Sequence, residues 1–259
     1  MRRLRSASKL LLGAAPVAAT LLGCSNQLQL GNDVVWGADH EPGSLEQWTG
    51  ADAGAAQLPS ADATIAISTE NAHSGNHSLK LVNPAAWPNT DEGPELFHDV
   101  GPLDDAYYSA WFLLPEQYRI EPWLTLMRLS SRDDAADGLH SAEELQLRSL
   151  ASGGYALQVF NNNAGFLLEP LADPVPRVEP GRWFQIEARL EPQAEGRLRV
   201  WLDGQLAYDL RGRPGATGHD QVLTVANIAE TSTPAPLVLY VDDAAVSLSR
   251  VSPAGKLHD

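Results

Sequence analysis

The sequence predicts an all-β fold, a two-sheet jelly-roll sandwich, and three observations lead to this class. From Val34 onward, no sustained helical periodicity appears. The apolar runs are short, rich in β-branched and aromatic residues, and bounded by Gly, Pro, Asn or Asp, as is typical of strands. About a dozen such runs follow one another without a helix, and a chain of this kind buries its apolar faces by packing one sheet on another.

The expected strands can be placed in order along the chain. They cover residues 64–68, 78–82, 106–114, 123–131, 144–150, 155–161, 183–191, 197–202, 205–210, 222–228 and 237–248. Asp203 and Gly204 supply the residues of a tight hairpin between two of these strands. Residues 130–141 and 211–220 are expected to be loops. No repeat or linker divides the chain, so residues 34–252 are expected to form one domain, followed by a tail at 253–259.

The clearest alternation lies at residues 183–190. Side chains along a strand point in turn to opposite faces. The apolar residues at even positions from Phe184 to Leu190 should therefore face the core. Gln185 and Glu187, at odd positions, should face solvent.

The first residues predict a secretory signal. Arg2, Arg3, Arg5 and Lys9 precede an uncharged apolar run that ends at Gly23, directly before Cys24. This run of about 14 residues is shorter than the roughly 20 needed for a transmembrane helix, which makes a permanent anchor the weaker alternative. A cysteine at this point resembles the lipobox of bacterial lipoproteins, which implies removal of residues 1–23 and lipidation of Cys24. An ordinary cleaved signal with an incidental cysteine is the other alternative.

The expected location follows from this interpretation. Residues 24–33 are polar and short, which fits a tether between a lipid and the domain. Ser25 after the cysteine resembles lipoproteins that are sent on to an outer membrane. We therefore expect a lipid-anchored protein of the cell envelope, at the outer membrane or cell surface.

Charge and cysteine content exclude several classes of partner. The chain of 259 residues has a formal net charge of −15, and residues 1–23 carry four basic residues and no acidic one. Nucleic acid is a poor partner because its binding needs basic groups, and contact with the membrane is expected only through the lipid. Cys24 is the single cysteine, so no disulfide forms within the chain. No phosphate-binding or dinucleotide motif is present.

Three segments stand out at the two ends of the domain: residues 36–48, which contain Glu41, the His73-Ser74-Gly75 turn before a strand, and the paired aspartates Asp242 and Asp243. Together they resemble calcium-binding jelly-roll carbohydrate-binding modules. The resemblance implies a structural Ca²⁺ held by Glu41 and one of the two aspartates, because alternation would let only one aspartate point to the ion. The alternative is that these carboxylates are ordinary surface and strand residues.

Three aromatic-rich segments lie in the middle of the chain, at residues 107–116, 183–187 and 200–204. They resemble the concanavalin A-like sandwiches of heparin-lyase-like polysaccharide lyases. The resemblance implies a polysaccharide ligand. Those lyases usually carry a Lys and a Tyr on a strand near the C-terminus, and residues 222–228 have neither.

A ligand-binding face can be proposed from alternation alone. If the apolar residues of 123–131, 144–150 and 155–161 face the core, their polar neighbours share the opposite face, where amides can bind sugar hydroxyls and arginines can bind a carboxylate or sulfate. The two arginines suggest an anionic glycan; alternatively, they pair with Glu143, Glu144 or Asp133. The candidate substrate-binding residues are Tyr107, Trp111, Arg128, Gln146, Arg148 and Gln158.

Three functions stay open at this stage. The first is a non-catalytic polysaccharide-binding lipoprotein. The second is a lyase acting by β-elimination on a uronic-acid polysaccharide, which would use His140 or Tyr155 for proton transfer. The third is a structural or protein-interaction lipoprotein of the envelope.

Overall fold

The computed structural model describes residues 33–52, 64–84, 93–103, 105–132, 139–161, 166–168, 176–191, 196–212 and 220–251. These residues form sixteen strands. No helix in this part of the chain is long and apolar enough to cross a membrane. The predicted signal peptide, Cys24, all but the last residue of the tether and the tail at 253–259 lie outside the described residues.

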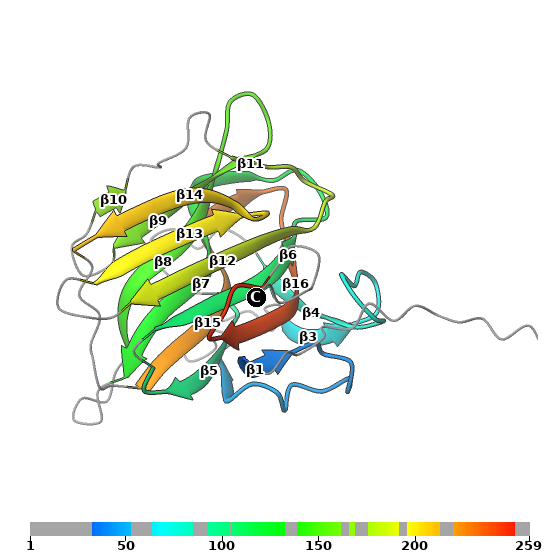
Figure 1. Cartoon of the computed structure of the whole chain (residues 1–259). Coiled ribbons are helices and arrows are strands. Elements are labelled where there is room, and N and C mark those ends of the chain that lie inside the picture. Colours follow the sequence, from blue (N-terminus) through cyan, green and yellow to red (C-terminus); the bar gives the residue numbers. More distant parts are fainter. Residues whose placement is uncertain are drawn as a thin grey trace, which may run out of the picture.

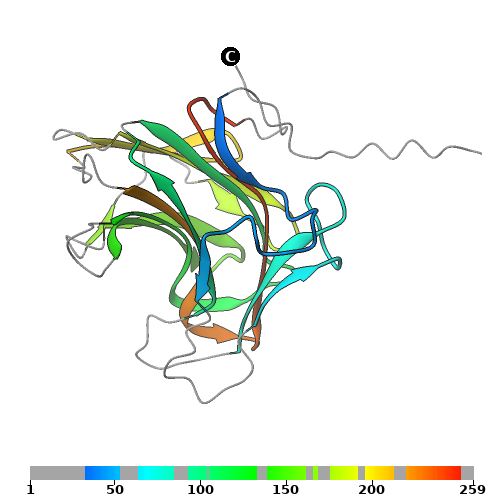
Figure 2. The same cartoon turned by 90° about the horizontal axis from the view of Figure 1, so that it is seen from below.

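The strands form two antiparallel sheets, which Figures 1 and 2 show as two layers. Sheet A has the order β14 (Gln205–Arg211), β13 (Arg197–Leu202), β12 (Phe184–Glu191), β6 (Ala106–Leu113), β16 (Leu237–Ser247), β4 (Ser78–Asn83) and β3 (Thr64–Ser68), with β1 (Val34–Ala38) also paired to β16. In Figure 2, β1 (blue) runs beside β16 (red).

Sheet B contains the longest strands. Its order is β10 (Phe166–Leu168), β9 (Tyr155–Asn161), β8 (Leu139–Ser149), β7 (Arg119–Arg132), β15 (Asp220–Thr233), β5 (Glu95–Gly101) and β2 (Gly50–Asp52), with β11 (Arg177–Val178) also paired to β9. Neighbouring strands bring residues that are distant in sequence onto one face. Thr224 of β15, for example, lies between Arg128 of β7 and Phe97 of β5.

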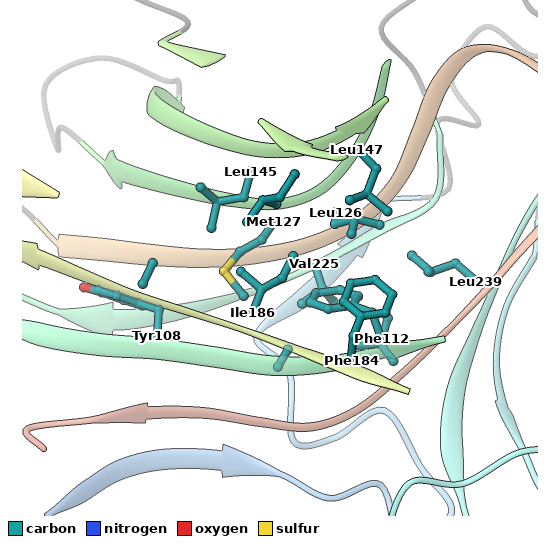
Figure 3. Packing of buried hydrophobic residues seen from close by; sticks show 14 of the residues in the cluster. Tyr108, Phe112, Leu126, Met127, Leu145, Leu147, Phe184, Ile186, Val225 and Leu239 are labelled. Atoms are coloured by element: carbon teal, nitrogen blue, oxygen red, sulfur yellow. The ribbon is translucent and has the colours of Figure 1, made fainter. Parts of the chain in front are cut away.

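The hydrophobic core lies between the two sheets (Figure 3). Sheet B contributes Met127, Leu145 and Leu147, and sheet A contributes Phe112 and Ile186, all of them fully buried. These residues recur with period two along their strands, because alternate side chains of each strand face the partner sheet. Burying this surface is the main favourable contribution to folding for a chain without a disulfide.

The predicted all-β jelly-roll sandwich is confirmed. The strands predicted at 64–68, 155–161 and 197–202 have the observed bounds, and Asp203 and Gly204 form the predicted hairpin turn with φ of 48° and 78°. The prediction of a loop at 130–141 is wrong at both ends, because β7 continues to Arg132 and β8 begins at Leu139. Strands β1, β2, β5, β10 and β11 were not predicted.

The expectation that Gln185 and Glu187 face solvent is also wrong. Both side chains are 1% exposed, although they point away from the core. The chain after β16 passes over them, and the Glu187 carboxylate accepts hydrogen bonds from the Val251 N–H and from Nε of Arg250 at 2.6 and 2.8 Å. Burial raises the pKa of Glu187, although these two bonds act in the opposite direction.

Candidate functional site

A row of polar side chains crosses the face of sheet B that points away from the core. We call it the polar row. Its members come from β9, β8, β7 and β5 and are joined to one another by hydrogen bonds and ion pairs, in the order Gln158, Gln146, Thr125, Glu144, Arg128 and Glu95.

Glu144 is the acceptor on which the row converges. One of its carboxylate oxygens accepts hydrogen bonds from the Thr125 hydroxyl and the Gln146 amide, each at 2.9 Å. The other oxygen lies 3.3 Å from Nε of Arg128. Glu144 is 5% exposed, and a buried carboxylate stays charged at low cost only when it is paired and hydrogen-bonded in this way.

Arg128 reaches across strand β15. Its Nη1 donates a hydrogen bond of 2.7 Å to Oε2 of Glu95 on β5. The β15 residues paired with these two positions are Thr224 and Ala226, whose side chains are small enough to let the arginine pass over them. The expected alternative in which Arg128 pairs with an acidic neighbour is therefore confirmed for Glu144, and Glu95 is a second partner that the sequence did not indicate.

The two glutamines of the row differ in the hydrogen-bonding capacity that they keep. Gln146 uses both amide hydrogens, one to Glu144 and a longer one of 3.3 Å to Thr125, and its oxygen accepts from Gln158. Gln158 donates one amide hydrogen to the Gln146 oxygen and makes no other hydrogen bond to a described residue. Gln146 therefore positions the row, while Gln158, which is 6% exposed, keeps one amide hydrogen and its carbonyl oxygen without a hydrogen bond to a described residue.

Partly exposed groups flank the polar row. Phe160 pairs with Glu144 across β9 and β8, and Phe97 pairs with Thr224 across β5 and β15. The ring of Phe97 lies over Gly50 of β2, where any larger residue would collide with it: a Cβ there would be 2.4 Å from the ring. Arg148 is exposed on the same face, two residues after Gln146, and pairs with no described acid.

Tyr107 and Trp111 do not belong to this face, which corrects the prediction that they join it. Both lie on β6 of sheet A, on its outer surface, opposite Arg189 and Gln185 of β12. The ring of Trp111 is 8% exposed because His73 stacks on it with 3.7 Å between ring centroids. Alternation placed these aromatics on the outside correctly, but it does not tell which sheet a strand joins.

Tyr155 is not placed for proton transfer to a ligand. It is fully buried on the core side of β9, where its hydroxyl accepts a hydrogen bond from the Tyr118 N–H and donates one to the Tyr118 carbonyl, at 2.7 and 3.1 Å. Burial raises its pKa to about 12. For His140, the backbone lies in β8 opposite Ser131, but its side chain is outside the described residues.

A second cluster gathers carboxylates around the turn at residues 73–76. Oε1 of Glu41 accepts hydrogen bonds from the Asn76 and His77 N–H groups, at 2.7 and 2.8 Å. Oδ2 of Asp242 accepts from the His73 and Ser74 N–H groups. Burial raises the pKa of Asp242, while the hydrogen bond with His40 lowers it.

Both aspartates face this turn, which corrects the expectation that only one could. A one-residue bulge separates Asp242 from Ala245 in the pairing with β6, and Asp243 adopts a left-handed conformation with φ of 45°. Asp243 therefore contacts the same turn through Nδ1 of His73 at 2.6 Å and the Ser74 hydroxyl at 2.8 Å.

The chemistry of this oxygen-rich cluster suits a hard cation, but its present geometry does not form a metal site. Among the described residues, no group of three or more His, Cys, Asp or Glu side chains is arranged to hold a metal ion. Glu41 and the two aspartates instead accept hydrogen bonds from the protein. The calcium site stays a prediction.

The fold is shared with several proteins of known structure. An endo-β-1,4-glucuronan lyase from the fungus Trichoderma reesei has a TM-score of 0.65 at 14% identity, over 87% of this chain and 100% of that chain. The cellulose-induced protein Cip1 has a TM-score of 0.58 at 19% identity, over 83% and 98%. A carbohydrate esterase from the Shiga toxin-encoding bacteriophage phi24B has 0.51 at 14%, over 82% and 97%.

These likenesses show the fold alone, because their sequence identity is low. No family model matches the sequence, and no curated protein is similar to it. The chain is therefore a jelly-roll sandwich, a fold that it shares with the glucuronan lyase, Cip1 and the phage esterase.

Proposed function

We propose that this protein is a non-catalytic polysaccharide-binding lipoprotein of the cell envelope, and that the polar row of sheet B with its flanking groups forms the binding face. The observation that carries the proposal is the juxtaposition of spare polar capacity at Gln158 with partly exposed rings at Phe160 and Phe97. Rings stack on the apolar faces of sugars, and amides bind their hydroxyls.

The face lacks the groups that a lyase needs, within the part that the structure describes. β-Elimination requires a base within hydrogen-bond reach of the proton beside the uronate carboxylate. The described side chains on this face include no Tyr, His or Lys, and Tyr155 points into the core. Binding without turnover is therefore the better-supported function.

The proposed location rests on the first 24 residues. A basic start, a short apolar run and a cysteine after glycine support lipidation at Cys24 and a place at the outer membrane or cell surface. Such a tether would hold the binding face close to envelope or extracellular polysaccharides. Metabolic labelling of the expressed protein with a lipid precursor tests this, and a Cys24→Ser variant that still carries the label would contradict it.

Binding is tested with the full chain, purified in detergent, against a panel of polysaccharides. We expect saturable binding that falls at least about tenfold in Phe160→Ala, while Gln205→Ala, an exposed position on sheet A, binds as the wild type. Failure of the whole panel to bind would contradict the proposal and favour a structural or protein-interaction role.

A polysaccharide lyase is the second candidate, and the likeness to the glucuronan lyase over the whole of that chain favours it. Ultraviolet absorbance of an unsaturated product tests it in the same samples. We expect no rise in absorbance when the protein is incubated with uronic-acid polysaccharides. A steady rise that His140→Ala abolishes would establish the lyase instead.

A further inference from the structure

Two large apolar side chains are exposed among the described residues, and both lie at one place on sheet A. Val35 of β1 is 45% exposed, and Leu248, directly after β16, is 57% exposed. Val34 pairs with Ser247, and the Leu248 N–H donates a hydrogen bond of 2.9 Å to the Asp33 carbonyl. The two exposed residues therefore occupy neighbouring positions where β1 runs beside β16. We call them the apolar pair.

A bulge in β1 explains why Val35 points outward. The pairing with β16 shifts register between Val34 and Trp36, so Val35 is an extra residue without a partner in the ladder. Trp36 packs against the core and Ala38 is fully buried, so alternation turns Val35 to the outer face of sheet A. Bulges re-aim side chains in this way, and an outward valine on a strand with one neighbour favours contact with another surface.

The chain leads from this place to the proposed lipid. Cys24 lies nine positions before Asp33, and even a fully extended segment of this length spans only about 30 Å. With Cys24 lipidated, the start of β1 is therefore held close to the bilayer surface. A short tether of this kind gives an effective concentration in the millimolar range, so a contact too weak to bind the free domain can hold the tethered one.

We infer that the apolar pair is a membrane contact, and that this end of sheet A rests on the lipid surface in which Cys24 is anchored. The inference rests on the lipidation in the proposed function, and it adds the orientation of the domain. The contact depends on apolar burial, because a chain with a net charge of −15 is not attracted to anionic head groups.

This orientation keeps the proposed binding face accessible. The apolar pair belongs to sheet A, whereas the polar row lies on the face of sheet B that points away from sheet A. A domain that rests on β1 and the residue after β16 therefore does not press the polar row against the lipid.

A fluorescent label at residue 33 tests the contact. Cys24 is the single cysteine, and the lipid blocks its thiol, so Asp33→Cys adds one reactive thiol beside the apolar pair. The lipidated protein carries a nitrobenzoxadiazole dye there and is reconstituted in phosphatidylcholine vesicles with nitroxide on part of the acyl chains. We expect the nitroxide, which acts only at short range, to quench this dye. The same dye at Gln205→Cys, an exposed residue of edge strand β14, should not be quenched.

A pair of double variants isolates the apolar surface. Val35→Ser with Leu248→Ser should lower the quenching at residue 33 at least about threefold, because each half-exposed side chain contributes on the order of a fivefold factor to docking. Val35→Ile with Leu248→Met keeps the apolar surface and should keep the quenching. Both positions are exposed, so neither double variant should change the denaturant midpoint appreciably.

The outcomes separate the two proposals. Equal quenching in the double Ser variant and the wild-type background would overturn the inference and leave lipidation intact, as would an unquenched residue 33 in protein that floats with the vesicles. Protein that does not float with the vesicles, and whose Cys24 thiol still takes the dye, would overturn the proposed lipid anchor and the inference with it.

A second copy of the chain is the other surface that could cover the apolar pair. Sedimentation velocity of the unlipidated Cys24→Ser protein tests this, and we expect a monomer. A dimer that Val35→Ser with Leu248→Ser dissociates would overturn the membrane contact in favour of an interface between copies.

Discussion

The hydroxyl of Tyr155 is hydrogen-bonded to both backbone groups of Tyr118, accepting from the N–H and donating to the carbonyl. It thereby ties the start of β9 to the segment that leads into β7, inside the core. Tyr155, a candidate for proton transfer in a lyase, is in this protein a structural cross-link between β9 and the segment before β7.

Replacing Tyr155 by Phe should therefore change stability and not ligand binding. The variant leaves the buried Tyr118 N–H without an acceptor, and this costs about 1 to 3 kcal/mol. Denaturant unfolding measures the loss, and the polysaccharide titration should be unaltered. Loss of any β-elimination activity in this variant, with normal stability, would contradict the structural role.

The two arginines of sheet B should behave differently when they are changed to Gln. Arg128→Gln removes the guanidinium that pairs with Glu95 and with buried Glu144, so we expect the free energy of unfolding to fall by about 3 kcal/mol. Arg148 is exposed and has no ion pair to a described residue, so the free energy of unfolding of Arg148→Gln should stay within about 0.5 kcal/mol of that of the wild type. Equal losses in the two variants would mean that the ion pairs of Arg128 do not form in solution.

Period-two alternation predicted much of this arrangement. It placed Arg128, Gln146 and Gln158 on one face, and the structure joins all three in the polar row. The glutamines, the arginine and Glu144 of the row could therefore be expected from the sequence. The other two members of the row, Glu95 and Thr125, could not. Glu95 lies in a strand without a clear apolar pattern, so no local signal pointed to it.

Alternation could not predict which strands become neighbours or where a strand changes register. Trp111 has the pattern of an outward residue, but it lies on the other sheet because β6 pairs with β12 and β16. The bulge at Asp243 is set by non-local pairing, since β16 pairs with β4 before it and with β1 after it. Burial of Glu187 by residues after β16 is equally non-local.

The turn at Gly75 gives a test of the carboxylate cluster. A Cβ at this position would lie 2.3 Å from the carboxyl carbon of Glu41, and the residue has φ of 59°. Gly75→Ala should therefore displace the flexible Glu41 side chain from the Asn76 and His77 N–H groups, and the free energy of unfolding should fall by about 2 kcal/mol. Gly43→Ala is the control, because it also has positive φ but nothing within 4 Å, and it should cost about 1 kcal/mol.

Calcium is tested at the same cluster. If an ion binds there, Glu41 and Asp242 must give up some of their hydrogen bonds to the turn, and the folded state gains the binding free energy of the ion. We expect calcium to raise the melting temperature of the chelator-treated protein, and Asp242→Asn to abolish the rise. Equal melting temperatures with calcium and with chelator would contradict the prediction.

The pH dependence of stability should carry a contribution from Glu187. Burial raises its pKa in the folded state above the ordinary value of 4.5, so the folded state binds this proton more tightly than the unfolded state. The resulting stabilisation is complete below the unfolded pKa and is lost as pH rises through the folded pKa. The free energy of unfolding of the wild type should thus fall, relative to that of Glu187→Gln, as pH rises from about 4.5.

This difference is measured by denaturant unfolding of both proteins at a series of pH values. Glu121→Gln, which changes the net charge equally at a site that is 57% exposed, should run parallel to the wild type. A wild-type curve that instead gains stability over Glu187→Gln with rising pH would mean that the hydrogen bonds from Arg250 and Val251 outweigh burial. The residues after β16 would then be held to sheet A by a fully charged carboxylate.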